Sequence, residues 1–360
     1  MRDKFPKLFI PGPTHVSDNI LKILSTPQIG HRTPEISILI SELKSKIKKV
    51  LYTDNHIHLI SHAATGLWEM GLTNSTKKSV LHAVNGAFSS KWALIPEKCC
   101  LKSSSIEYDW GHGIKVEDVD KMLQTGDFDV FAMVHNETST GVKSNLEEIS
   151  ELLKSKYPDV IWLLDAVSSM AGIKINVDKL GIDFIFSSTQ KAWGIPAGFS
   201  ILSVSDRYIE KSKTIINKGY FLDILTYEKY YEKDQTPSTP SIPHMFALKK
   251  VLEMIDLEGL DQRWERHKEM ARITQEWALS HNQALFPEPG FRSETITCIK
   301  NVQNWDINKI NDELLNLGYR MDRGYGNLRG KAFRIAHMGN IYQSDLIKYL
   351  HDFDKVLLNV

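Results

Sequence analysis

The residues best suited to chemistry are a lysine and an aspartate, each of which follows a short apolar run. Residues 183–188 (DFIFSS) lead into Lys191, and residues 160–164 (VIWLL) lead directly into Asp165. Runs of this length and composition predict buried β-strands. If both are parallel strands of an open α/β sheet, ligands bind beyond their carboxyl ends. We therefore expect an amine and a carboxylate to face the same crevice.

An amine and an acid in one crevice suit the cofactor pyridoxal phosphate. The amine of Lys191 can capture an aldehyde, and the carboxylate of Asp165 can keep a pyridine nitrogen protonated. Taken singly, a lysine after a strand is most often a solvated loop residue, and an aspartate there often caps a helix. The occurrence of both on successive predicted strands favours the cofactor hypothesis.

Three further runs place small, aromatic or polar residues after predicted strands. Ala64 and Thr65 begin a helical segment whose backbone N–H groups could hold a phosphate, although a plain turn of small residues is the alternative. Phe88 could stack on a flat ring, although a core phenylalanine fits equally well. Residues 135–141 (HNETSTG) are too polar for a simple turn, and Thr138 among them could hydrogen-bond a phenolic oxygen.

One arginine lies inside a predicted strand. Arg334 is the third residue of the run at 332–336 (AFRIA), and a semi-buried guanidinium needs an anionic partner. The α-carboxylate of a substrate would suit its bidentate fork. A structural carboxylate of the protein is the alternative.

The pattern of elements predicts an α/β fold. Apolar runs alternate with amphipathic helical segments from about residue 35 to 217, which indicates repeated βα units. The predicted strands of this part are residues 57–61, 79–84, 130–135, 160–165, 183–187 and 198–204. A helix at 35–51 shows apolar residues at three-and-four spacing, with Pro34 in its first turn.

The composition of the sequence changes near residue 220. Residues 219–243 are rich in tyrosine and proline and show little helical or strand character. A long helix then runs from about 244, breaks at Gly259 and resumes to 282, before a smaller α+β unit. The elements predicted for that unit are strands near 295–299 and 332–336 and helices at 306–317 and 343–355. We expect a large domain at 15–245 and a small domain at 246–360.

Composition sets limits on partners and compartment. The chain has 360 residues, with 44 Lys plus Arg against 44 Asp plus Glu, so no net charge attracts nucleic acid or a membrane surface. No apolar stretch is long enough to cross a bilayer, and the first residues lack the apolar centre of a signal peptide. Three cysteines cannot build a disulfide framework, so we expect a reducing cytoplasm.

Together these runs resemble the class V aminotransferases, the group of alanine–glyoxylate, serine–pyruvate and phosphoserine aminotransferases. The resemblance extends from residues 11–14 (PGPT) to Arg334, and its most specific parts are the 135–141 run and the spacing from Asp165 to Lys191. It implies an aspartate-aminotransferase-like fold (fold type I of the pyridoxal-phosphate enzymes). In this fold a mostly parallel seven-stranded sheet forms the large domain, and a smaller α+β domain follows.

The resemblance also implies roles for individual residues. By that likeness Lys191 is the Schiff-base lysine and Asp165 the partner of the pyridinium nitrogen. The other cofactor contacts that it implies are Val167 and Phe88 on opposite faces of the ring, Thr138 at the phenolic oxygen, and Ala64, Thr65 and Gln190 around the phosphate. Many relatives have a glycine-rich phosphate loop and a tryptophan stacker, whereas this chain has Ala63-Ala64 and Phe88.

A homodimer with shared active sites follows from the same resemblance. The family completes its phosphate site from a second subunit, and the matching positions here are Thr236 and Thr239. The N-terminal segment 1–14 is expected to line the active site, with Gly12 and Arg334 at the substrate.

The implied reaction moves an amino group between a small amino acid and a 2-oxo acid, with Lys191 as the general base. His31 and Arg32 match a His-Arg pair that meets the substrate phosphate in phosphoserine enzymes. Phosphoserine with 2-oxoglutarate, a step of serine biosynthesis, is therefore the leading expectation. Alanine or serine with glyoxylate, or serine with pyruvate, remain open because the Gly-His-Arg run also occurs in relatives that use those substrates.

A function of another class is a metal-dependent hydrolase. His56 and His58, with His62, His135 and Asp165, could suit a metal in a β/α barrel. Against this, we expect only one of His56 and His58 to reach the crevice, and the helix-rich C-terminal unit does not continue a barrel. A dimeric scaffold without activity is a third possibility, and the joint presence of Lys191, Asp165 and Arg334 argues against it.

Overall fold

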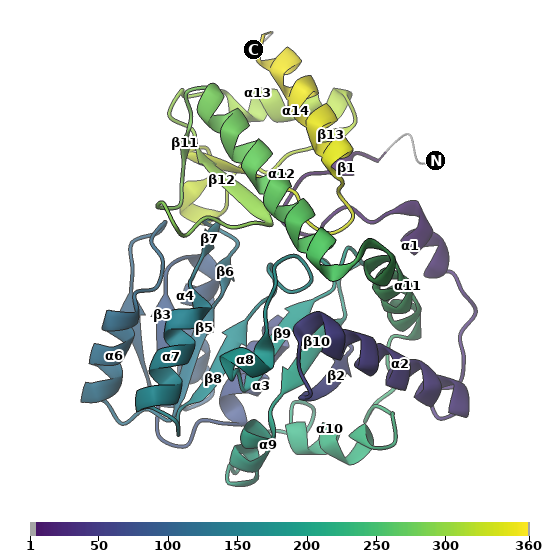
Figure 1. Ribbon diagram of the computed structural model, residues 1–360, viewed down its shortest axis with the longest axis vertical. Coiled ribbons are helices and arrows are strands. Elements are labelled where there is room, and N and C mark those ends of the chain that lie inside the picture. The colour runs from purple at the N-terminus through teal and green to yellow at the C-terminus, as the bar shows by residue number, and fades with distance from the viewer. Residues whose placement is uncertain (1–4, 359–360) are drawn as a thin grey trace.

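A seven-stranded sheet and a smaller three-stranded sheet organise the molecule (Figure 1). The computed structural model describes residues 5–358. The strands of the large sheet, in spatial order, are β2 (His56–Ile60), β10 (Ser200–Val204), β9 (Phe184–Ser188), β8 (Ile161–Asp165), β5 (Val130–Val134), β3 (Val80–Val84) and β4 (Ser103–Glu107). Strand β10 is antiparallel to β2 and β9, and the other neighbouring pairs are parallel. The predicted mostly parallel seven-stranded sheet is confirmed.

The sequence predicts six of these strands and misses β4. Its residues (SSSIE) carry no apolar run, because β4 lies at the edge of the sheet and its side chains are exposed or half-buried. The central strands β5, β8 and β9 are buried along their whole length, as expected of strands covered on both faces.

Two layers of helices cover the large sheet. One apolar cluster joins the sheet to α2 (Pro34–Leu51), α6 (Val116–Thr125), α7 (Leu146–Lys156), α8 (Val177–Leu180) and α11 (Ile242–Glu258). A second cluster joins the other face to α3 (Thr65–Thr73), α4 (Ala87–Ala93), α9 (Asp206–Lys213) and α10 (Ile224–Tyr231). Two short helices, α1 (Asp18–Ile23) and α5 (Ile95–Lys98), complete this part.

The expectation of little regular structure at 219–243 is wrong for its first half. Helix α10 spans Ile224–Tyr231, and the side chain of Asp223 accepts the N–H of Leu225 at its start. The helix buries Ile224 and Tyr227, so its apolar face is narrow and partly built from tyrosine. The many tyrosines, and the prolines that follow, leave no clear spacing of apolar residues from which this short helix could be predicted.

The smaller sheet packs beside three long helices. Its antiparallel strands, in order, are β11 (Ala284–Leu285), β12 (Ile296–Lys300) and β14 (Ala332–Ala336). The helices are α12 (Leu260–Ser280), α13 (Ile307–Asn316) and α14 (Gln343–Leu357), with a 3₁₀ turn η2 (Gly326–Leu328) before β14. A parallel pair, β1 (Lys7–Leu8) and β13 (Tyr319–Arg320), ties the N-terminal segment to this unit.

Helices α11 and α12 meet at Gly259, which has a φ of 83°. This left-handed conformation favours glycine and ends the first helix where the sequence predicts the break. Helix α11 packs on α1 and α2, whereas α12 packs on α14 and the smaller sheet. The domain division at 245/246 itself stays a prediction.

A two-stranded ribbon of β6 (Asn136–Glu137) and β7 (Val142–Lys143) follows β5. The N–H of Ser293 donates to the carbonyl oxygen of Gly141, and Val142 pairs with Arg292 in an isolated bridge, so this ribbon touches the segment that leads into the smaller sheet. The carboxyl ends of the parallel strands therefore face the smaller unit (Figure 1). In the described part of the chain, no helix combines the length and the apolar character needed to cross a bilayer.

Candidate functional site

Lys191 lies three residues beyond the end of β9, and only 9% of its surface is exposed. Its Nζ donates a hydrogen bond to the carbonyl oxygen of Pro11 at 2.9 Å. Burial, and then the positive charge of Arg334, lowers the pKa of this amine to about 8. About a tenth of the amine is then unprotonated at pH 7, far more than for an ordinary lysine, and the unprotonated form is the one that a nucleophile or a base requires.

Asp165 is the last residue of β8, and it pairs with Phe186 of β9 in the parallel register. Its Oδ2 accepts the indole N–H of Trp68 at 2.6 Å, and its Oδ1 accepts the backbone N–H of Val167 at 2.8 Å. Burial raises the pKa of Asp165 to about 6, although these two hydrogen bonds oppose the shift. The charges of Asp165 and Lys191 also shift one another's pKa, so the amine and the acid lie near enough to interact electrostatically.

The N-terminal segment covers Lys191 (Figure 1 shows this segment crossing to the smaller unit). The backbone N–H of Thr14 donates to the carbonyl of Gln190 at 3.0 Å, and the Thr14 hydroxyl donates to the carbonyl of Lys191 at 2.9 Å. A Cβ atom at Gly12 would lie 2.6 Å from Nζ of Lys191. Any side chain at this position would therefore displace the amine.

Phe88 lies beside the same amine, with Nζ of Lys191 5.9 Å from the centre of its ring. The ring of Phe88 stacks with Tyr325 at a centroid distance of 5.2 Å. Its backbone is held by Glu137, whose buried carboxylate accepts the N–H groups of Phe88 at 3.1 Å and Ser89 at 2.9 Å. Glu137 thus fixes the start of α4 and the aromatic residue that α4 presents.

The run 135–141 is buried throughout. Its polar side chains therefore hydrogen-bond to other protein groups and do not face solvent. The hydroxyl of Thr138 is in short contact with that of Ser168. The imidazole of His135 hydrogen-bonds the hydroxyl of Ser169 at 2.9 Å, and burial lowers the pKa of His135 to about 3. His135 is therefore neutral at physiological pH.

Arg334 is 4% exposed and has two protein partners. Its Nε and Nη2 donate to the two carboxylate oxygens of Asp322, each at 2.7 Å, and its Nη1 donates to the carbonyl oxygen of Thr138 at 2.7 Å. Asp322 thus occupies the side of the guanidinium that Nε and Nη2 form. One N–H of Nη1 and one N–H of Nη2 remain, and these two donors are what a second carboxylate would use.

The residues predicted to bind the cofactor phosphate lie on three separate segments of the chain. Ala64 is the buried residue that precedes α3, and Thr65 is its exposed first residue, so the helix N-terminus opens outward. Gln190 is half-buried, and its side-chain oxygen accepts the hydroxyl of Ser188 at 2.6 Å. The hydroxyl of Thr236 donates to the carbonyl of Ser238 at 2.7 Å, and Thr239 is exposed.

His31 and Arg32 are not brought to the lysine within the chain. Arg32 is exposed, and its guanidinium donates to the carbonyl oxygens of His31 at 3.2 Å and Pro237 at 3.3 Å. Among the described residues, no hydrogen bond or ion pair links His31, Arg32, Thr236 or Thr239 to Lys191 or Asp165. The His-Arg pair therefore lies next to the proline-rich segment at Pro237.

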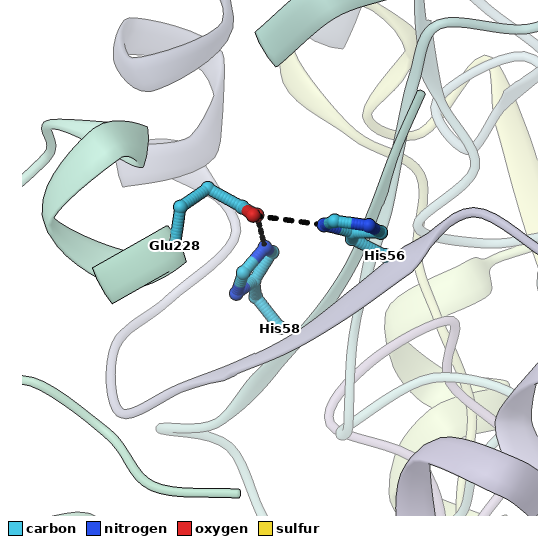
Figure 2. Close-up of side chains that lie close together, drawn as sticks. All are labelled: His56, His58 and Glu228. Carbon is cyan, nitrogen blue, oxygen red and sulfur yellow. Dashed lines mark hydrogen bonds and ion pairs between the residues drawn. The ribbon is translucent and has the colours of Figure 1, made fainter. Parts of the chain in front are cut away.

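The barrel that the metal-dependent hydrolase requires does not form, because the large sheet is open and ends at β2 and β4. The sequence predicts that only one of His56 and His58 reaches the crevice, and the structure instead turns both rings toward another element. Both rings contact Glu228 of α10 (Figure 2). His62 instead contacts the carbonyl of Ala63, and His135 contacts Ser169, so the five residues proposed for that metal do not meet.

Sequence reasoning misses the residues that hold the chemical groups in place. Trp68 lies 97 positions from Asp165, and Glu137 lies 49 positions from Phe88. Asp322 precedes Arg334 by 12 positions, and the need of a buried guanidinium for an anion was the signal that could have found it.

Comparisons with known proteins agree with this arrangement. Residues 28–316 match the family described as Aminotransferase class-V. An uncharacterized aminotransferase of Methanocaldococcus jannaschii is 35% identical over 95% of this chain and 90% of its own length. The L-aspartate–glyoxylate aminotransferase of Paracoccus denitrificans is 29% identical over 93% of this chain and 86% of its own.

A solved structure extends the agreement to the whole fold. The alanine–glyoxylate aminotransferase from Nostoc sp. superposes with a TM-score of 0.92 at 27% sequence identity. The match covers 98% of this chain and 95% of that one.

Proposed function

We propose, from the premise that this chain belongs to the class V aminotransferases, that it transfers the amino group of a small L-amino acid to glyoxylate. Members of this family are transaminases that depend on pyridoxal phosphate, so the reaction joins an amino acid and a 2-oxo acid. The observation that carries the proposal is that Lys191 is a buried amine, held by the carbonyl of Pro11, on which the charges of Asp165 and Arg334 both act.

The described residues fit the cofactor. We assign Lys191 to the aldehyde carbon, since it is a buried amine with a lowered pKa. We assign Asp165 to the ring nitrogen, because an acid already oriented by Trp68 and Val167 can hold a proton there. When bound, pyridoxal phosphate withdraws electrons from the substrate α-carbon, which makes the proton on that carbon removable.

The remaining cofactor contacts are proposed from position. Phe88, near Nζ of Lys191, and Val167, next to Asp165, would lie on the two faces of the ring. Thr138 would donate to the phenolic oxygen. The N-terminus of α3 at Ala64 and Thr65 would hold the phosphate, because the start of a helix and its dipole favour an anion. Gln190 would complete that site.

We further propose that two subunits share each site. Thr236 and Thr239, together with His31 and Arg32, form a surface that has no link to Lys191 in its own chain. A homodimer would place this surface at the phosphate of the partner's cofactor. This assignment gives a function to a proline-stiffened segment that otherwise ends on exposed hydroxyl groups.

Different residues of the chain would bind the substrate, move its proton and exclude water. Arg334 would bind the α-carboxylate through its two remaining N–H groups, while Asp322 and the carbonyl of Thr138 hold the guanidinium in place. Lys191, once released, would move the proton from the substrate α-carbon, and a pKa of about 8 suits that task near neutral pH. Gly12 and Thr14 would keep water from the amine on the N-terminal side.

Small substrates fit the crowding around the lysine. Gly12 leaves no room for even a methyl group beside Nζ, and Tyr325 covers Phe88 while also lying 5.5 Å from the guanidinium of Arg334. The relative from Paracoccus denitrificans and the structure from Nostoc sp. are both named for glyoxylate. We therefore choose alanine or serine with glyoxylate from the alternatives that the sequence leaves open.

A substrate panel tests this choice. We expect kcat/KM for alanine or serine with glyoxylate to exceed that for phosphoserine with 2-oxoglutarate by at least about tenfold. Such a ratio corresponds to about 1.4 kcal/mol of differential transition-state binding. Initial rates should be measured for each donor with glyoxylate, pyruvate and 2-oxoglutarate. A higher kcat/KM for phosphoserine would overturn the choice of substrate and leave the aminotransferase assignment standing.

Phosphoserine with 2-oxoglutarate is the second candidate, and one contact favours it. The guanidinium of Arg32 donates to the carbonyl of Pro237, so the His-Arg pair lies against the segment that carries Thr236 and Thr239. If Arg32 binds a substrate phosphate, Arg32→Ala will lower kcat/KM for phosphoserine only. If it does not, the variant will treat all donors alike.

Replacement of Arg334 by lysine should weaken the binding of every amino and oxo substrate. We expect kcat/KM to fall by about 10²-fold, because a point charge replaces a bidentate fork and Asp322 loses its planar partner. The affinity for pyridoxal phosphate should change little. Arg272→Lys on the exposed face of α12, whose guanidinium pairs with Glu269 and Glu276, is the matched control. An unchanged kcat/KM in Arg334→Lys would remove Arg334 from the substrate site.

A further inference from the structure

A cluster of two histidines and a glutamate lies at the edge of the large sheet, outside the amino-transfer site. His56 and His58 are two positions apart on strand β2, so both side chains point to the same face of the sheet. Glu228 reaches them from α10, which packs against that face (Figure 2). Its Oε2 lies 2.8 Å from Nδ1 of His56, and its Oε1 lies 2.7 Å from Nε2 of His58.

The three side chains offer one ligand atom each, and these atoms all lie within 4.8 Å of one another. Two imidazoles and one carboxylate form a common ligand set for zinc, at bond lengths of about 2.0–2.2 Å. We propose that His56, His58 and Glu228 bind a divalent transition-metal ion, zinc by preference, that ties α10 to the edge strand of the sheet. A water molecule would fill the fourth position.

The surroundings already hold both rings in a fixed orientation. The ring of His56 stacks on Tyr231 at 4.2 Å and 6° between planes. Tyr227 meets the ring of His58 edge-on at 6.0 Å. Nε2 of His56 lies 3.7 Å from Oδ1 of Asp206. A carboxylate at the second ring nitrogen of a metal-binding histidine orients that ligand and strengthens it.

The charges near the cluster leave a net attraction for a cation. Lys44 is the nearby cation, and its Nζ is neutralised by Asp234 at 2.6 Å. The carboxylates of Glu228 and Asp206 remain on the same side. His56 is 29% exposed, which gives an ion a path from solvent, whereas His58 is buried. An ion here would take the place of the two direct hydrogen bonds between the ring nitrogens and Glu228.

Zinc content and thermal stability test the site in the full-length, cofactor-loaded protein. The protein is treated with a chelator, dialysed against zinc chloride and freed of unbound metal before elemental analysis. We expect one zinc per chain and a rise in Tm of about 3 °C or more, because an ion bound to the folded state alone stabilises it. A wild-type protein that retains no zinc would refute the proposal.

Matched variants locate the metal. Glu228→Gln should lose the bound zinc and the rise in Tm, whereas Glu232→Gln, the same change one turn later at the end of α10, should keep both. If Glu228→Gln does not fold, His56→Gln decides at a partly exposed position, with the exposed His112→Gln as its control. Equal zinc in the wild type and in these cluster variants would place the metal elsewhere and overturn the assignment.

Discussion

Lys191→Ala should lose at least about 10³-fold in turnover, because the variant lacks both the group that binds the aldehyde and the base that moves the α-proton. The protein should still fold, since the side chain makes one hydrogen bond, to the carbonyl of Pro11. It should bind pyridoxal phosphate without the yellow colour of the lysine-linked cofactor. Absorbance spectra and steady-state rates measure both effects.

Borohydride reduction provides the direct control for this assignment. In the wild type, reduction followed by peptide mapping should find the cofactor attached at Lys191. Lys213→Ala, at an exposed lysine of α9, should keep colour and rate. A Lys191→Ala protein that stays yellow and turns over at the wild-type rate would contradict the proposed chemistry.

Asp165→Asn should lower kcat by about 10³-fold. A unit charge about 4 Å from the ring nitrogen is worth about 4 kcal/mol at an effective dielectric constant near 20, and the amide cannot replace that charge. Asparagine keeps the shape and one of the two hydrogen bonds from Trp68 and Val167. The affinity for the cofactor should fall as well. Steady-state kinetics at saturating cofactor separate the two effects, and Asp159→Asn at an exposed position is the control. Wild-type kcat in Asp165→Asn would remove this residue from the ring nitrogen.

The same acid gives cofactor binding a pH dependence. Burial raises the pKa of Asp165 to about 6 in the cofactor-free protein, so its negative charge is lost as the pH falls through that value. Binding to a protonated ring requires the charged form. We therefore expect affinity for pyridoxal phosphate to be greatest above pH 6 and to fall by up to about tenfold per pH unit below it. The ratio of dissociation constants for wild type and Asp165→Asn removes the titration of the cofactor itself. A constant ratio between pH 5 and pH 8 would show that Asp165 does not carry this dependence.

The elements that the sequence predicts well are those with a strong local signal. Helix α2 begins at Pro34 and buries residues at three-and-four spacing, so periodicity and a start signal agree. The junction of α11 and α12 is visible because Gly259 adopts a positive φ. Strand β4 and helix α10 are missed because each has little apolar surface, one at a sheet edge and one built around tyrosine.

The sequence by itself determined the reactive groups: an amine and an acid after successive apolar runs, and an arginine within a third. Local pattern suffices there, because neighbouring parallel strands bring their carboxyl ends to one edge. Only the tertiary structure decided what tunes and holds those groups. Trp68 on Asp165, Pro11 on Lys191, Asp322 on Arg334 and Glu228 between two histidines are contacts between elements. A side chain's type does not reveal such a partner, because burial and long-range packing create the pair only when the chain has folded.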